Sequence, residues 1–172
     1  MFVTNTKKIV VIALLIALEI ILTRFLVIQT PTMRLSLGFV PIALMAIMYG
    51  PIYAGIGAVL ADIIGTSFFS PLTLFPGFTL TAALIGIVYG LLLYNHHDRH
   101  YGKIRIWLAV LIVTIILQFG LDTFWLQIIT GNGFLAILPT RIVRTLIMTP
   151  IQLVSILLIL SEQFYRHIPR DV

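Results

Sequence analysis

Six long apolar stretches separated by short polar segments run through almost the whole chain. A membrane-spanning helix needs about 20 predominantly apolar residues, with a range of roughly 17–25. The pattern predicts six membrane helices, at about residues 8–28, 37–49, 51–66, 76–94, 106–129 and 139–164. The second and third are short and meet at a tight Gly50-Pro51 turn. We therefore expect one all-α membrane domain over residues 1–172, a six-helix bundle with a depression in one face.

Composition agrees with a membrane protein. Hydrophobic residues make up 60% of the chain, charged residues 10%, and the mean hydropathy is +1.11. So few polar side chains cannot cover the surface of a soluble domain. Because Glu19 and Arg24 interrupt the first stretch and no small-residue cleavage site follows it, we interpret it as a retained helix rather than a signal peptide. Cysteine is absent, so neither disulfides nor a thiolate metal site are expected.

The basic residues outside the apolar stretches predict the orientation. They lie at the start of the first stretch, in the loop after the fourth and in the C-terminal tail: Lys7, Lys8, Arg99, Lys103, Arg105, Arg166 and Arg170. With six spans, all these segments fall on one side, which the positive-inside rule makes cytoplasmic. Both termini are therefore predicted to be cytoplasmic in a cell-membrane protein. The net charge of +5 reflects this bias rather than nucleic-acid binding.

Charged residues also lie inside the apolar helices, which is unusual. They are Glu19, Arg24, Arg34, Asp62, Asp122, Arg141 and Arg144. Each costs on the order of 2.5–3.5 kcal/mol at a helix centre, so their presence indicates a function within the bundle. Most fall toward the side opposite the basic segments, which predicts a polar pocket open to the extracellular side.

Three arginines are predicted to lie near the outer ends of their helices: Arg34, Arg141 and Arg144. Arg141 and Arg144 are three residues apart and share one helix face. Guanidinium groups at one depth repel each other unless an anion lies among them, and they bind carboxylates through two parallel hydrogen bonds. These arginines are candidate ligands for an anionic substrate. The alternatives are contact with lipid phosphates or pairing with aspartates.

Two aspartates are candidates for reading a ligand ring. Asp122 shares a helical face with Gln118 and Trp125, and Asp62 lies near the outer end of the third helix. A carboxylate, an amide and an indole on one stripe suit a flat, nitrogen-rich ring. Equally, each aspartate could simply neutralise an arginine. Neither aspartate has His or Glu at metal-ligand spacing, so no metal site is expected.

Other polar and aromatic clusters carry weaker signals. Phe68, Phe69, Phe75 and Phe78 crowd the second outer loop, where they form either an interfacial belt or the wall of a binding cleft. The predicted cytoplasmic loop after the fourth helix contains His96, His97 and His100. Such a cluster is more typical of a solvated loop than of a metal site. The chain has no nucleotide motif, nucleophile–base pair or cofactor fingerprint, so we expect neither an enzyme nor a bound cofactor.

Ala13 and Ala17 form a small-xxx-small pair on the first helix. Small residues let helices approach closely, either within one protein or against a separate subunit. The pair is therefore a candidate docking surface as well as a candidate packing surface.

Several runs resemble the substrate-binding S components of energy-coupling factor (ECF) vitamin transporters. RLSLGFVPIALMAIMYGPIYAGIGAVLADIIG (34–65), FPGFTLTAALIGIVYGLLLY (75–94) and PTRIVRTLIMTPIQ (139–152) are similar to the folate-specific type. The resemblance implies a subunit that binds folate in an outward-facing pocket and docks on a transmembrane coupling protein with two ATPases. It places the docking pair at Ala13 and Ala17. Its pocket matches the positions of Arg34, Asp122, Trp125, Arg141 and Arg144; we also include Asp62, Phe75 and Gln118.

Three alternatives remain. An S component for another anionic vitamin, such as pantothenate, needs arginine but no ring-reading aspartate and tryptophan. A stand-alone facilitator needs a polar stripe through both halves of the bundle. The inner halves of helices three to six are almost entirely apolar, which argues against that class. An intramembrane enzyme lacks a catalytic constellation.

Overall fold

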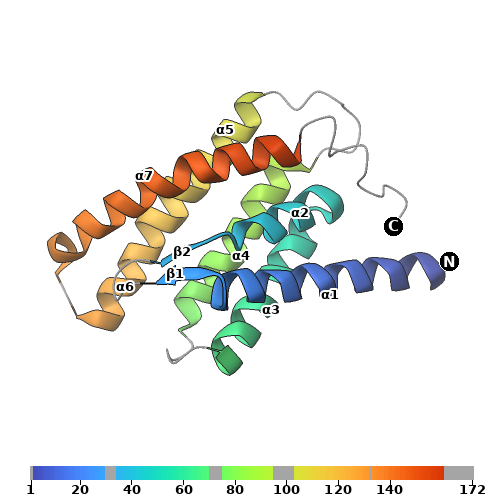
Figure 1. Cartoon of the computed structure of the whole chain (residues 1–172), viewed down its shortest axis with the longest axis horizontal. Helices are drawn as coiled ribbons and strands as arrows, with labels where there is room; N and C mark the ends of the chain where they lie inside the picture. Colours follow the sequence, from blue (N-terminus) through green and yellow to red (C-terminus); the bar gives the residue numbers. More distant parts are fainter. Residues whose placement is uncertain (1, 30–33, 70–74, 95–102, 132, 161–172) are drawn as a thin grey trace.

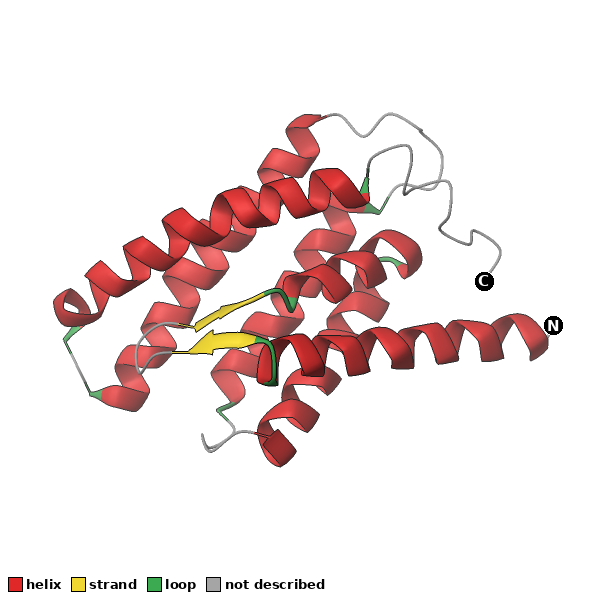
Figure 2. Cartoon of the chain, viewed as in Figure 1, coloured by secondary structure: helices red, strands yellow, loops and turns green. Residues whose placement is uncertain are grey.

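The computed structural model describes residues 2–29, 34–69, 75–94, 103–131 and 133–160. Helices dominate it, and two short strands form its one described sheet (Figures 1 and 2). In chain order the elements are α1 (Phe2–Arg24), β1 (Val27–Gln29), β2 (Arg34–Ser36), α2 (Phe39–Tyr49), α3 (Pro51–Phe69), α4 (Pro76–Leu93), α5 (Lys103–Leu111), η1 (Ile112–Leu121), α6 (Asp122–Thr130) and α7 (Phe134–Ile159).

The strands form an antiparallel hairpin in which Val27 pairs with Ser36 and Gln29 with Arg34. The hairpin lies toward the left of Figure 1, whereas the N-terminal end of α1 and the C-terminal end of α7 lie toward the right. We call the left-hand side the hairpin end. It comprises the hairpin, the C-terminal turns of α1 and α3, the N-terminal turns of α4 and α7, and α6. Side-chain contacts described below connect these helix ends.

Four of the described helices are long and apolar enough to cross a membrane: α3, α4, the continuous segment Ile104–Thr130, and α7. The apolar helix α2 is shorter, with 11 residues. The 23-residue helix α1 includes Lys7, Lys8, Glu19 and Arg24. The protein is therefore an all-α membrane protein by length and composition of its helices.

Several predicted boundaries were wrong. The first helix was expected to reach Ile28, but α1 ends at Arg24 and Val27–Gln29 is a strand. The N–H groups of Phe25 and Leu26 both bond to the Ile21 carbonyl, which closes the helix, and β-branched Val27 and Ile28 suit extended backbone. Between the first and second predicted helices, the described residues Gln29 and Arg34–Ser36 consequently belong to strands.

The last helix begins earlier than predicted. Its start was placed at Pro139, but α7 begins at Phe134 after Gly133, and both Pro139 and Pro150 lie inside it. Each proline removes one backbone donor, which a long, packed helix tolerates. The helix is described to Ile159, and the predicted continuation to residue 164 lies outside the described residues.

The segment between Lys103 and Thr130 is continuous but not uniform. Its middle third, η1, has π-helical hydrogen bonding, and the Asp122 N–H bonds to the Leu117 carbonyl five residues back. This wide turn shifts the register of side chains between α5 and α6. The sequence pattern predicted one regular helix here.

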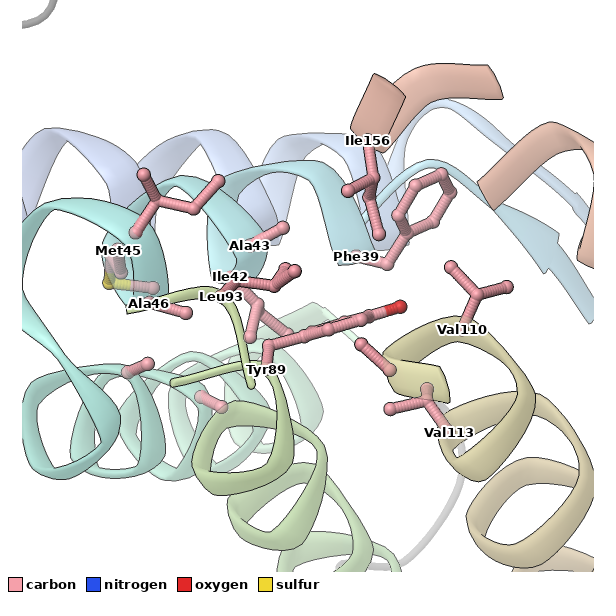
Figure 3. Close-up of a cluster of buried hydrophobic side chains, with 14 of the residues drawn as sticks. Phe39, Ile42, Ala43, Met45, Ala46, Tyr89, Leu93, Val110, Val113 and Ile156 are labelled. Carbon is pink, nitrogen blue, oxygen red and sulfur yellow. The ribbon is translucent and has the colours of Figure 1, made fainter. Parts of the chain in front are cut away.

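Small residues bring α3 and α4 together. A Cβ on Gly90 would lie 2.2 Å from Pro51 Cα, and one on Gly86 would lie 2.5 Å from the Ala54 carbonyl oxygen. Both positions therefore require glycine. The apolar core includes this contact and combines residues of α2, α3, α4, α5, η1 and α7. Figure 3 shows many of them around the ring of Tyr89.

Candidate functional site

An ionic cluster joins α6 to α7 at the hairpin end. Arg144 Nη1 lies 3.7 Å from Asp122 Oδ2, and both side chains are largely buried. Arg141, one turn earlier on α7, is only 7% exposed and also interacts electrostatically with Asp122. Its Nε atom has no hydrogen-bond partner among the described residues. The cluster thus holds two arginines against one aspartate, an excess of positive charge that favours an anionic ligand.

An aromatic wall adjoins this cluster. The ring centroid of Trp125 lies 5.7 Å from that of Phe75 and 5.2 Å from that of Phe124. Trp125 donates its indole N–H to the Thr81 hydroxyl at 3.2 Å, and that hydroxyl donates to the Gly77 carbonyl. A Cβ on Gly77 would lie 2.5 Å from both rings, so glycine is needed for this arrangement.

A second polar network joins α1, α3 and α4. Arg24 Nη2 donates to the Thr66 hydroxyl at 2.7 Å and lies 3.4 Å from Asp62 Oδ1. Thr79 donates to the other carboxylate oxygen of Asp62 at 2.7 Å. Gly65 leaves the space for the guanidinium, since a Cβ there would lie 2.7 Å from Arg24 Nε. Asp62 therefore neutralises Arg24, which is the structural alternative considered for it.

A buried polar chain lies deeper in the bundle, one helical turn beyond Asp122. Tyr89 donates its hydroxyl to Gln152 Oε1 at 3.0 Å, and Gln152 Nε2 donates to Gln118 Oε1 at 3.2 Å. Tyr89 and Gln152 are fully buried. The inner halves of α4 and α7 are thus less purely apolar than expected, but these polar groups bond to each other across the bundle.

The structure brings most predicted site residues together. Asp122, Trp125, Arg141 and Arg144 form one cluster with Phe75 beside it, and Gln118 lies one turn deeper. Asp62 belongs to the separate network of Arg24. Arg34 is placed by its backbone in β2, a strand that contacts α7.

Other predicted residues lie elsewhere. Ala13 and Ala17 are exposed on α1, away from the hairpin end. Glu19 is buried and interacts electrostatically with Arg24. His96, His97 and His100 lie outside the described residues. Among the described residues, no group of three His, Cys, Asp or Glu side chains is placed to hold a metal ion.

Sequence reasoning missed the residues that support the site. Thr79 and Thr81 lie two positions apart on α4, so one bonds toward α3 and the other toward α6. Threonine near the start of an apolar helix was an available signal. Gln152 was another, because a glutamine in an apolar helix needs a buried partner.

A shallow apolar groove also lies between α3 and α4, lined by Val59, Ile63, Pro76, Thr79, Leu80 and Ala83. It presents almost no polar atoms. In a membrane-spanning pair of helices such a surface suits lipid chains, so we do not assign the ligand to it.

Comparison with known proteins defines the class. The family model of the ECF transporter, substrate-specific component, matches residues 7–160, and the chain belongs to that family. It is 41% identical over 144 residues to the folate transporter FolT of Clostridium novyi, covering 84% of this chain and 82% of that protein. It is 31% identical to FolT of Leuconostoc mesenteroides subsp. mesenteroides over 98% of this chain and 92% of that protein.

A solved structure agrees with these relatives. A crystal structure of FolT bound with folic acid superposes with a TM-score of 0.84 and 34% sequence identity, covering 92% of this chain and 95% of that one. The fold described above is therefore that of an S component.

Proposed function

We propose that this chain is the folate-binding subunit of an ECF-type vitamin importer. The observation that carries the proposal is the cluster of Asp122, Trp125, Arg141 and Arg144 at the hairpin end, in a chain similar to FolT proteins over most of its length. The glutamate tail and the pterin ring of folate can each bind to side chains in this cluster or beside it.

The two ends of folate need different chemistry. Its glutamate tail carries two carboxylates, which suit the unpaired hydrogen-bonding capacity of Arg141. Its pterin ring carries adjacent N–H donors, which suit the carboxylate of Asp122, and a flat face, which suits Trp125 and Phe75. The loose 3.7 Å contact between Asp122 and Arg144 leaves the carboxylate available to exchange partners when ligand enters.

In the proposed orientation the hairpin end faces outward and both termini face the cytoplasm. Six helical segments, counting α5, η1 and α6 as one, then form a single membrane domain with its pocket near the extracellular side. In this proposal Arg34 of β2 joins Arg141 and Arg144 as a ligand for the carboxylates of folate.

Delivery of folate into the cell needs energy that this chain has no motif to supply. We place its docking surface for the transmembrane coupling protein, which carries two ATPases, on the exposed face of α1 around Ala13 and Ala17. The neighbouring Val10, Leu14 and Ile21 are also exposed, so the face is wide enough to receive a partner helix.

The decisive experiment is equilibrium titration of the purified subunit in detergent with folate, in the absence of ATP and divalent metal. We expect saturable 1:1 binding. Pantothenate serves as the comparison ligand because it is anionic but has no ring. Tight pantothenate binding without folate binding would contradict the folate assignment and leave the S-component class in place.

A further inference from the structure

The hydrogen bonds of the buried polar chain Tyr89–Gln152–Gln118 all run in one direction, from donor to acceptor. The Tyr89 ring crosses the apolar core from α4, and its hydroxyl points away from α4 toward Phe39 and Val110 (Figure 3). There the hydroxyl meets Gln152 of α7, which in turn meets Gln118 of η1. Three helices thus contribute one side chain each to a continuous line of hydrogen bonds.

We infer that Tyr89 and Gln152 are positioning residues that make Gln118 present an N–H donor to the ligand, and thereby select an oxo group over an amino group on the bound ring. The inference rests on the proposed function and deepens it, because it names a feature of the ring that the site distinguishes.

The direction follows from the tyrosine. Tyr89 is fully buried, and Gln152 Oε1 is its hydrogen-bond acceptor among the described residues. If both amides were reversed, the Tyr89 hydroxyl would accept from Gln152 and its own hydrogen would lack an acceptor. Leaving a buried donor unsatisfied costs about 1–3 kcal/mol. The observed direction of the hydrogen bonds is therefore the stable one, and the carbonyl oxygen of Gln118 accepts the hydrogen bond from Gln152.

What Gln118 has left is its amide N–H₂. The side chain is half-buried, so it keeps an open side, and it precedes Asp122 by four residues on the same continuous helix. An acceptor at Asp122 and a donor at Gln118 then lie about one helical turn apart. The edge of the pterin ring offers the complementary order: an amino group and a ring N–H, followed by an oxo group. Asp122 suits the first two, and Gln118 suits the third.

A pair of ligands probes this contact. Folic acid and its 4-amino analogue aminopterin share the glutamate tail and the ring face, but aminopterin carries an amino donor in place of the oxo acceptor. Aminopterin also lacks the hydrogen on the neighbouring ring nitrogen that faces Asp122, so variants of the polar chain are needed to separate the part of the preference that Gln118 contributes. Both are titrated against the intact subunit in detergent. We expect wild type to prefer folic acid by roughly 5- to 150-fold, the cost of a buried polar group that lacks its partner.

The positioning role is tested with Tyr89→Phe. Without the hydroxyl, both directions of the amide pair become comparable in energy, so Gln118 can present either group and most of the preference for folic acid should disappear. Tyr49→Phe is the matched control, because Tyr49 is also buried but its hydroxyl has no hydrogen-bond partner among the described residues. That variant should keep the wild-type ratio. Gln118→Met, which removes the donor itself, should lower the preference even if Tyr89→Phe does not fold, and the preference that remains is the part contributed by Asp122.

Three results overturn the inference. Equal binding of both ligands by wild type, or preference for aminopterin, would show that Gln118 does not present a donor. A Tyr89→Phe variant that weakens both ligands equally would show that the hydroxyl only supports packing. If wild type binds neither ligand, the proposed function falls together with the inference, whereas in the first two cases folate still binds and the function stands.

Discussion

The indole N–H of Trp125 donates a hydrogen bond to the Thr81 hydroxyl at 3.2 Å, so the aromatic wall on α6 is held in place by α4. The same hydroxyl donates to the Gly77 carbonyl in the turn before it. The position of the ring therefore depends on how closely the first turn of α4 approaches α6, and a single methyl group can change that distance.

Gly77→Ala should disturb this wall. The added Cβ would lie 2.5 Å from both Phe75 and Trp125, so one of the rings must move. We expect destabilisation of about 1–3 kcal/mol from overpacking, together with weaker folate binding. Thermal unfolding and folate titration of the purified subunit measure the two effects. Gly120→Ala is the control, because its Cβ would meet the Ile115 carbonyl oxygen at an ordinary 3.6 Å. Equal behaviour of the two variants would contradict the steric argument.

Asp62 should act on stability rather than on ligand recognition. Its carboxylate neutralises the buried Arg24 and accepts from Thr79. Asp62→Asn leaves the guanidinium without its counter-charge, and because Asp62 is partly exposed we expect a loss of about 2–3 kcal/mol, at or below the lower end for breaking a buried pair. The measurement is thermal unfolding in detergent, paired with folate titration of the folded fraction. A loss of folate affinity beyond about tenfold with unchanged stability would instead make Asp62 a ring-reading residue.

Arg141 should read the anionic tail of the ligand. Its side chain is buried and its Nε lacks a partner among the described residues, whereas Arg144 already contacts Asp122. Arg141→Ala should therefore cost about 2–5 kcal/mol of folate binding, because a buried carboxylate loses its partner. Pteroate, which lacks the glutamate, provides the comparison. It should lose far less affinity; equal losses for the two ligands would show that Arg141 does not contact the tail.

The sequence predicted the helices well because each apolar run is long and bounded by Gly, Pro or charge. Gly50-Pro51 ended α2 and began α3 where expected. The prediction from sequence failed at the strands between Val27 and Ser36, because a three-residue strand is too short to show the alternation of apolar and polar residues. It also failed at Pro139, because a proline inside a packed helix resembles the proline that often begins a helix. The pairing of Asp62 with Arg24 rather than with the α7 arginines depends on which helices pack together, and no local pattern carries that information.

Ala13 and Ala17 should matter for transport but not for binding. Both lie exposed on α1, away from the ionic cluster on α6 and α7. Ala13→Trp and Ala17→Trp each add bulk that prevents close approach of a partner helix, so either should abolish ATP-driven folate uptake by vesicles that contain the whole complex. Folate affinity of the isolated subunit should stay unchanged, because the new side chain does not reach the site.

Leu14→Trp is the comparison for these two variants. Because Leu14 is already a large exposed side chain on the same helix, its replacement by Trp should impair uptake less. Uptake that survives both alanine substitutions would place the docking surface elsewhere. Loss of binding in the isolated subunit would show that the alanines pack the bundle instead.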